Sequence, residues 1–222
     1  MAFRLNLVGR LALVALLALS VSACNRGLVR QAPGGKAGLS PVDQDPRANL
    51  YSKTVSAAKA GDCSTDNLSI LTCFAARGRG FEGAQTLLGK CLISRGAEEK
   101  GAEWIAMAAN ADWADAQYEM AKLAQEGRGM PADPVAAAKW SFLYTQNPAL
   151  MSLGVPADKE RHNKLLANLT PAQKDEARRQ ARDFSPTFRQ PEVVLTAEAQ
   201  KACRVRSIPV IDEVEFYNPD AT

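Results

Sequence analysis

Apolar residues recur at helical spacing through the middle of the chain. In the segments 83–92 and 115–124 they stand at positions i, i+4, i+7 and i+8. The stripe consists of Ala84, Leu88, Cys91 and Leu92 in the first segment and of Ala116, Met120, Leu123 and Ala124 in the second. This spacing places the residues of each set on one face of a helix, so the pattern predicts two equivalent amphipathic helices.

A second helix follows each of these two. The segment 101–109 (GAEWIAMAA) matches 137–145 (AAKWSFLYT) at an offset of 36 residues, whereas the first helices match at an offset of 32. The four-residue difference falls between the matched blocks, where a repeat protein tolerates an insertion in a loop. Self-similarity at this period is typical of stacked two-helix units, so we expect hairpins over 81–110 and 111–147.

Further helices are predicted on both sides of the repeats. They cover 50–61 and 67–76 as a degenerate first unit, 157–168, 171–184 and a short stretch near 197–203. The helical period fails at Asn147-Pro148, and the alternating run over 207–216 predicts an extended segment. Gly89 and Ala121 occupy equivalent positions beside the apolar stripes, where small side chains let helices approach closely.

Helix start and stop signals agree with these boundaries. Asp133 precedes Pro134, so a capping carboxylate stands directly before a proline at the first helical position. Thr170 and Gln173 have the spacing of a capping box at the start of the 171–184 helix.

The second unit resembles a Sel-one-like repeat (SLR), an α/α-hairpin relative of the tetratricopeptide repeat. The motif residues are Ala116-Gln117-Tyr118, Gly127-Arg128-Gly129, Pro131, Asp133 and Ala137-Ala138-Lys139-Trp140. The upstream unit departs from the pattern, because its glycine loop is shortened to Ser94-Arg95-Gly96 and Thr86 stands where a tyrosine is expected. The resemblance covers about 81–147.

The resemblance implies an all-α fold, an α/α-hairpin solenoid over 50–184 whose concave face binds other proteins. Tyr118, Lys122 and Gln125 lie opposite the apolar stripe and are candidates for that face, although a solvated surface is the alternative. Trp113 precedes the same helix, either as an exposed binding anchor or as a buried staple between units. An irregular C-terminal tail is expected over 185–222.

The N-terminus is expected to be a processing signal. Residues 1–23 hold two arginines and then the uncharged run LALVALLAL, which is too short to span a bilayer comfortably. The sequence Val21-Ser22-Ala23-Cys24 resembles the lipobox of bacterial lipoproteins. This resemblance implies a diacylglycerol and an acyl chain on Cys24, with Asn25 favouring the outer membrane; an ordinary secretory signal is the alternative. Residues 24–49, rich in Pro and Gly, read as a flexible tether.

Charge and composition exclude two classes of function. Removing residues 1–23 lowers the net charge from +3 to +1, which is too small for a nucleic-acid groove. A single histidine, His162, rules out a His-based zinc cluster, and no Cys-x-x-Cys pair exists, so no metal or cofactor is expected. His162 stands among charged residues and is expected at the surface.

Four cysteines remain for disulfides in an oxidising compartment, and they allow three pairings. Some cysteine-rich SLR proteins are penicillin-binding or weak β-lactamases. In this chain, the positions equivalent to their paired cysteines hold Arg77 with Gln85 and Ala109 with Gln117, so their cysteine signature is missing.

Antiparallel hairpins would bring Cys63 near Cys91, and Cys203 could then join the tail to Cys73. Alternatively, Cys91 is a small hydrophobic residue of the core stripe that forms no disulfide.

The function expected from these features is a membrane-anchored periplasmic scaffold, without catalysis, that binds other envelope proteins. One alternative is a β-lactam-binding or peptidoglycan-acting SLR protein. The other is a soluble periplasmic regulator of a sensor protein.

Overall fold

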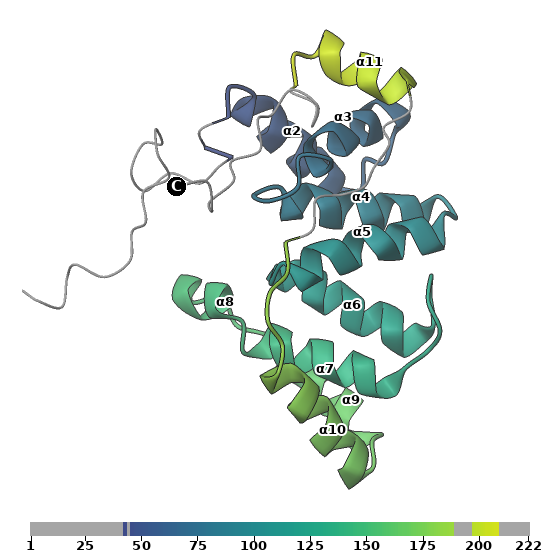
Figure 1. Cartoon of the computed structure of the whole chain (residues 1–222), viewed down its shortest axis with the longest axis vertical. Coiled ribbons are helices and arrows are strands. Elements are labelled where there is room, and N and C mark those ends of the chain that lie inside the picture. Colours follow the sequence, from purple (N-terminus) through teal and green to yellow (C-terminus); the bar gives the residue numbers. More distant parts are fainter. Residues whose placement is uncertain (1–41, 44, 189–196, 209–222) are drawn as a thin grey trace, which may run out of the picture. The chain divides into compact units, whose positions relative to one another are not determined.

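The computed structural model describes residues 42–43, 45–188 and 197–208, and within these residues every regular element is an α-helix (Figure 1). The helices are α2 (Ala48–Lys59), α3 (Thr65–Ala75), α4 (Glu82–Ser94), α5 (Glu98–Asn110), α6 (Ala114–Glu126), α7 (Pro134–Thr145), α8 (Pro148–Leu153), α9 (Lys159–Ala167), α10 (Pro171–Arg182) and α11 (Ala197–Val205). The expected all-α class is confirmed. The leader, Cys24, most of the expected tether and the alternating run beyond Ile208 lie outside the described residues.

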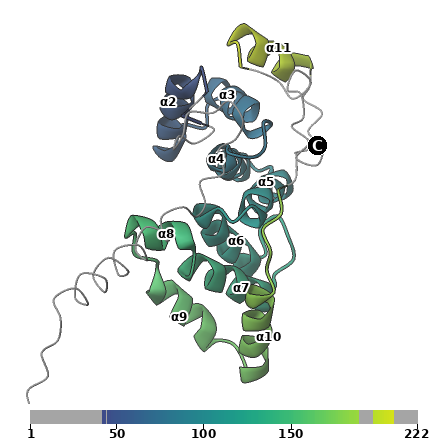
Figure 2. The ribbon, with the colours of Figure 1, turned by 60° about the vertical axis from the view of Figure 1, so that its left-hand side comes forward.

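Helices α2 to α7 form three successive hairpins. Each helix packs against the next one along the chain, and α2 also contacts α4, which in turn contacts α6 (Figures 1 and 2). The first helices of the three hairpins therefore share one face of the stack. This arrangement lets each hairpin bury its apolar stripe against its neighbours.

The predicted helix caps form. The Asp133 carboxylate accepts hydrogen bonds from the two backbone N–H groups of Val135 and Ala136, both at 2.9 Å. Thr170 and Gln173 form the reciprocal capping box at the start of α10. Gly127 ends α6 with a φ of +67°, a left-handed conformation that glycine adopts without steric cost.

Small residues set the distance between helices. A Cβ atom on Gly89 of α4 would lie 2.5 Å from the carbonyl oxygen of Gly101 on α5. The reverse contact, from a Cβ on Gly101 to the Gly89 carbonyl oxygen, would also be 2.5 Å. The sequence pattern indicated Gly89 as a point of close approach but did not identify Gly101 as its partner.

The C-terminal part packs on both ends of the stack. Helices α9 and α10 contact α7, and α11 contacts α3. Helix α8 was not predicted, because the sequence pattern indicated only a break at residues 147–148. It begins at Pro148, where the Asn147 side chain accepts a hydrogen bond from the backbone N–H of Ala149. Local capping is thus sufficient to start a short helix without an apolar period.

Candidate protein-binding groove

A groove of about 710 Å³ crosses α2, α4 and α6, the first helices of the three hairpins. Its walls include Tyr51 and Val55 of α2, Leu87 and Lys90 of α4, and Tyr118 and Glu119 of α6. We call this surface the α2/α4/α6 groove. It combines apolar walls with a few charged groups, a composition found in many ligand sites.

The repeat offset explains which residues line the groove. Leu87 and Glu119 are 32 residues apart and occupy the same position on α4 and α6, and Val55 lies 32 residues before Leu87. Thr86 and Tyr118 are related in the same way. The sequence analysis assigned only the Tyr118 face of α6 to binding; carrying the 32-residue offset back to α2 would have located the other walls.

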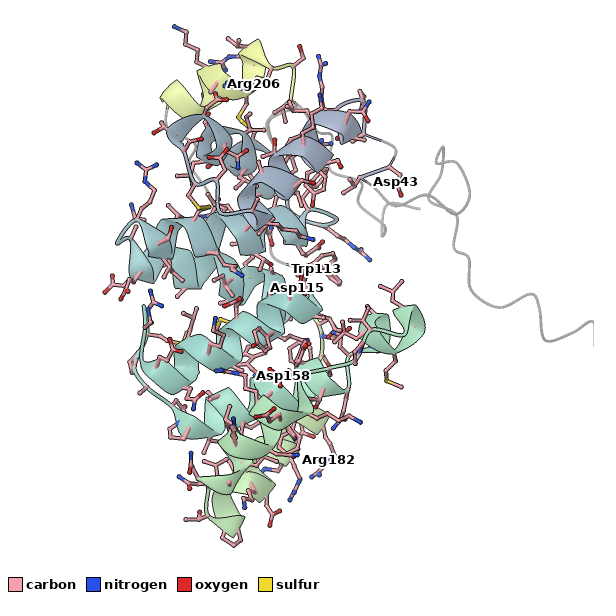
Figure 3. All side chains as sticks on the ribbon, turned by 180° about the vertical axis from the view of Figure 1, so that it is seen from behind. Asp43, Trp113, Asp115, Asp158, Arg182 and Arg206 are labelled. Atoms are coloured by element: carbon pink, nitrogen blue, oxygen red, sulfur yellow. A yellow bond between two sulfur atoms is a disulfide. The ribbon has the colours of Figure 1, made fainter. Side chains whose placement is uncertain are left out.

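Trp113 lies at the rim of this groove, directly before α6 (Figure 3). Its side chain is 41% exposed, which is unusual for a residue of this size. The indole also reaches across to α4, because a Cβ on Gly83 would lie 3.4 Å from Trp113 Cζ2. The two expected roles of Trp113 therefore do not exclude each other: one edge of the ring joins α6 to α4, and the remainder faces solvent.

Glu119 ties α4 to α6 at the floor of the groove. Its carboxylate lies 2.8 Å from Lys90 Nζ and 3.1 Å from Lys122 Nζ. Burial by itself raises the pKa of Glu119, but the hydrogen bonds and charges of Lys90 and Lys122 outweigh burial and lower it. Lys122 is thus held by an ion pair and does not line the groove.

Tyr51 forms the aromatic end of the groove. Its ring meets Phe74 edge-on at 5.1 Å and Phe81 at 5.5 Å between centroids. Burial, together with the negative charge of Glu82, raises the pKa of Tyr51 to about 12. The same hydroxyl also interacts with the backbone of Ala84, which opposes this rise in pKa.

The remaining candidates on α6 contact the C-terminal helices. The Tyr118 ring lies 5.1 Å from that of Tyr144 and 5.6 Å from the Arg161 guanidinium. The Gln125 amide oxygen accepts a hydrogen bond from Arg161 Nη2 at 2.9 Å. Tyr118 therefore lines both the groove and a smaller pocket shared with α9, whereas Gln125 lines the smaller pocket and not the groove.

Two disulfides link the four cysteines of the described region: Cys63–Cys91 and Cys73–Cys203. These are the two pairs that hairpin geometry suggested. Cys63 and Cys91 both line the groove, so this disulfide fixes the α2–α3 turn against α4.

His162 is less exposed than the sequence analysis expected. It is half-buried between α9 and α7, with Nδ1 2.8 Å from Ser141 Oγ and its ring against Phe142. Burial, and secondarily the positive charge of Arg178, lowers the pKa of His162. The charged residues beside His162 in the sequence did not predict its partial burial, because the groups that surround it belong to α7 and α10.

Among the described residues, no group of three or more His, Cys, Asp or Glu side chains is placed to hold a metal ion. Within the described ranges, no helix is both long and apolar enough to cross a membrane.

Comparison with known proteins gives a single result of interest. No family model and no curated protein matches the chain. One solved structure with a similar arrangement is the crystal structure of c5321, described as a protective antigen present in uropathogenic Escherichia coli strains displaying an SLR fold. The two are 22% identical with a TM-score of 0.47, and the alignment covers 78% of this chain but 38% of that one.

Proposed function

We propose that this chain is a scaffold that binds other proteins of the bacterial envelope through the α2/α4/α6 groove. The observation that carries the proposal is the groove itself, built from the first helices of three successive hairpins with Trp113 half open at its rim. Exposed tryptophans beside an apolar groove are typical energetic centres of protein interfaces.

The character of the groove favours a segment of another protein over a small charged metabolite. Val55, Leu87 and the rings of Tyr51 and Trp113 supply apolar contact area. Tyr51 and Lys90 supply polar groups that can fix the orientation of a bound backbone. Such a pattern of apolar walls with scattered polar groups is characteristic of grooves that bind a short helix or an extended peptide.

The proposal includes attachment to the outer membrane on its periplasmic face. Its support is the lipobox-like sequence ending in Cys24, whose acyl chains would be the membrane contact. Metabolic labelling with a palmitate analogue is expected to mark the wild type and not Cys24→Ala. Labelling that persists in Cys24→Ala contradicts the anchoring part of the proposal.

The binding part is tested by crosslinking in cells. A photoreactive amino acid at position 113 is expected to capture a defined partner, whereas the same group at exposed position 182 on α10 serves as the matched control. Capture at neither site, or the same products at both, would show that the groove is not the binding surface. A variant of the groove wall is the second measurement: Val55→Glu, at a partly exposed position, is expected to abolish capture at position 113.

A further inference from the structure

Helix α8 presents an uncharged apolar surface to solvent. Residues 148–157, PALMSLGVPA, contain no ionisable side chain, and we call them the α8 knob. Met151 is 71% exposed, Leu153 76% and Val155 47%, and none of the six helical residues is buried. Neighbouring exposed apolar side chains of this size commonly mark a contact surface.

The knob is held firmly at both ends. At its start, Asn147 Nδ2 donates to the Asp112 carbonyl oxygen at 3.0 Å and to Gln117 Oε1 at 3.0 Å. At its end, Asp158 Oδ2 lies 3.5 Å from the Tyr118 hydroxyl. The start of the knob is therefore anchored by buried hydrogen bonds, which reduces the conformational entropy lost when its apolar side chains bind.

Both attachment points involve α6 or the turn before it, a segment that also contributes residues to the α2/α4/α6 groove. Asp112 directly precedes Trp113, and Tyr118 itself lines the groove. The apolar protrusion and the apolar groove thus share α6 as a common support. A molecule that carries a protrusion beside a matching recess can pair with a second copy by mutual insertion.

We propose that the α8 knob of one copy inserts into the α2/α4/α6 groove of a second copy, and that the exchange is reciprocal. Reciprocal insertion uses the same two surfaces on both copies, so the contact is two-fold symmetric and closes at a dimer. In the proposed dimer, Met151 and Leu153 lie against Val55 and Trp113 of the other copy, both of which line its groove.

The charges around the groove and the knob favour pairing with a second copy over binding of a charged peptide or of an anionic lipid surface. The ionisable groups that flank the apolar walls are Lys59, Lys90, Asp115 and Glu119, a balanced set that an uncharged insert does not unbalance. A strongly charged peptide, whether acidic or basic, would be repelled by the two groove residues that carry the same charge. An anionic lipid surface attracts basic clusters, but the knob is followed by the alternating sequence Asp158-Lys159-Glu160.

This pairing goes beyond the proposed scaffold function and would regulate it, because an inserted knob occupies the same groove as a partner. The scaffold proposal and the pairing proposal can be refuted independently of each other. Loss of partner capture at position 113 addresses the scaffold, whereas the pairing is measured between two copies of this chain.

The test uses two differently tagged full-length copies expressed in one cell and purified through one tag. Wild-type copies are expected to purify together. Leu153→Asp in both copies, or Val55→Glu in both copies, is expected to reduce copurification about tenfold or more, the effect of losing roughly 1.4 kcal/mol. Arg182→Asp in both copies is the control and is expected to change nothing.

The decisive sample combines Leu153→Asp in one copy with Val55→Glu in the other. This mixture retains one intact knob opposite one intact groove, so copurification is expected to recover. Trp113→Glu serves as a second groove variant, and a helical circular dichroism spectrum with a cooperative urea transition verifies folding of every variant.

Three outcomes overturn the pairing. The first is copurification that Leu153→Asp leaves unchanged, and the second is a mixture that does not recover although both variants fold. The third is capture of phosphatidylglycerol vesicles by the purified wild type that Leu153→Asp alone abolishes, because this result assigns the knob to a lipid surface.

Discussion

At the scale of single residues, the contact between Gly89 and Gly101 shows how one atom determines helix spacing. Each glycine faces the backbone carbonyl of the other across the α4–α5 interface. Ala121, the residue equivalent to Gly89 in the next hairpin, is buried and does carry a Cβ. At this repeat position, the α4–α5 hairpin therefore has no room for a Cβ atom, whereas the α6–α7 hairpin accommodates one.

Replacing Gly89 by alanine is expected to destabilise the protein. The added Cβ would lie 2.5 Å from a backbone oxygen and 2.6 Å from Ile105 Cγ1, so α4 and α5 must move apart. Overpacking of this kind costs about 1–3 kcal/mol, more than the roughly 1 kcal/mol that alanine contributes through helix propensity. Urea unfolding measures the change, with exposed Glu103→Ala as the control; an unchanged midpoint for Gly89→Ala would refute the close contact.

A second residue, His162, makes stability depend on pH. Its pKa is lower in the folded protein than the ordinary value of 6.5, because burial and the Arg178 charge disfavour the protonated ring. As the pH falls below about 6.5, the unfolded chain therefore binds more protons than the folded protein does. Because the pKa is lower in the folded protein, the free energy of unfolding is highest above this pH and decreases as the pH falls.

We expect the unfolding free energy to decrease between pH 8 and about pH 5.5, and to decrease less in His162→Gln. The glutamine keeps a group that can hydrogen-bond Ser141 but does not titrate. Chemical denaturation at a series of pH values checks this. Equal slopes for both proteins would show that another group is responsible.

At the scale of elements, Asn147 connects α8 to the turn before α6. Its side-chain oxygen caps α8, and its side-chain nitrogen donates to Asp112 and Gln117. The residue is 2% exposed, so water cannot replace these partners. One amide thereby fixes both the start and the position of the α8 knob.

Asn147→Ala is expected to lower the unfolding free energy by about 1–3 kcal/mol, the cost of leaving a buried amide network unsatisfied. The substitution should also increase hydrogen exchange across 148–157, because the cap of α8 is lost. Asn163→Ala on the exposed side of α9 is the control. Hydrogen exchange in α8 that equals that of the wild type would contradict the anchoring role of Asn147.

At the scale of the whole molecule, the disulfides tie distant segments together. Cys73–Cys203 spans 130 residues of sequence and holds α11 against α3, whereas Cys63–Cys91 spans 28 residues within the first two hairpins. An ion pair between Arg206 and Asp66 also links the two segments. Helix α11 thereby packs on the first hairpin, whereas α10, the helix before it in the sequence, packs on α7.

The double variant Cys73→Ala/Cys203→Ala is expected to lower the unfolding free energy by about 2–4 kcal/mol. The Cys73–Cys203 disulfide closes the longer loop and so restricts the unfolded chain more. Its removal is therefore expected to lower the unfolding free energy more than Cys63→Ala/Cys91→Ala does. Denaturant unfolding without reductant compares the two. A larger loss for the shorter loop would mean that contacts in the groove wall dominate over chain entropy.

The sequence by itself determined the helices other than α8 and most of their boundaries, because these depend on local information. Periodic apolar residues, the Asp133 cap, the Thr170 capping box and Gly127 act within one or two turns. The 32-residue offset also determined which positions of α4 and α6 are equivalent.

Only the tertiary structure decided what lies opposite each helix. The partner of Gly89, the surroundings of His162, the contact of Gln125 with Arg161 and the base of the α8 knob all join residues distant in sequence. Such contacts depend on how helices pack, and packing follows from the combined shape of many side chains, which no local pattern encodes.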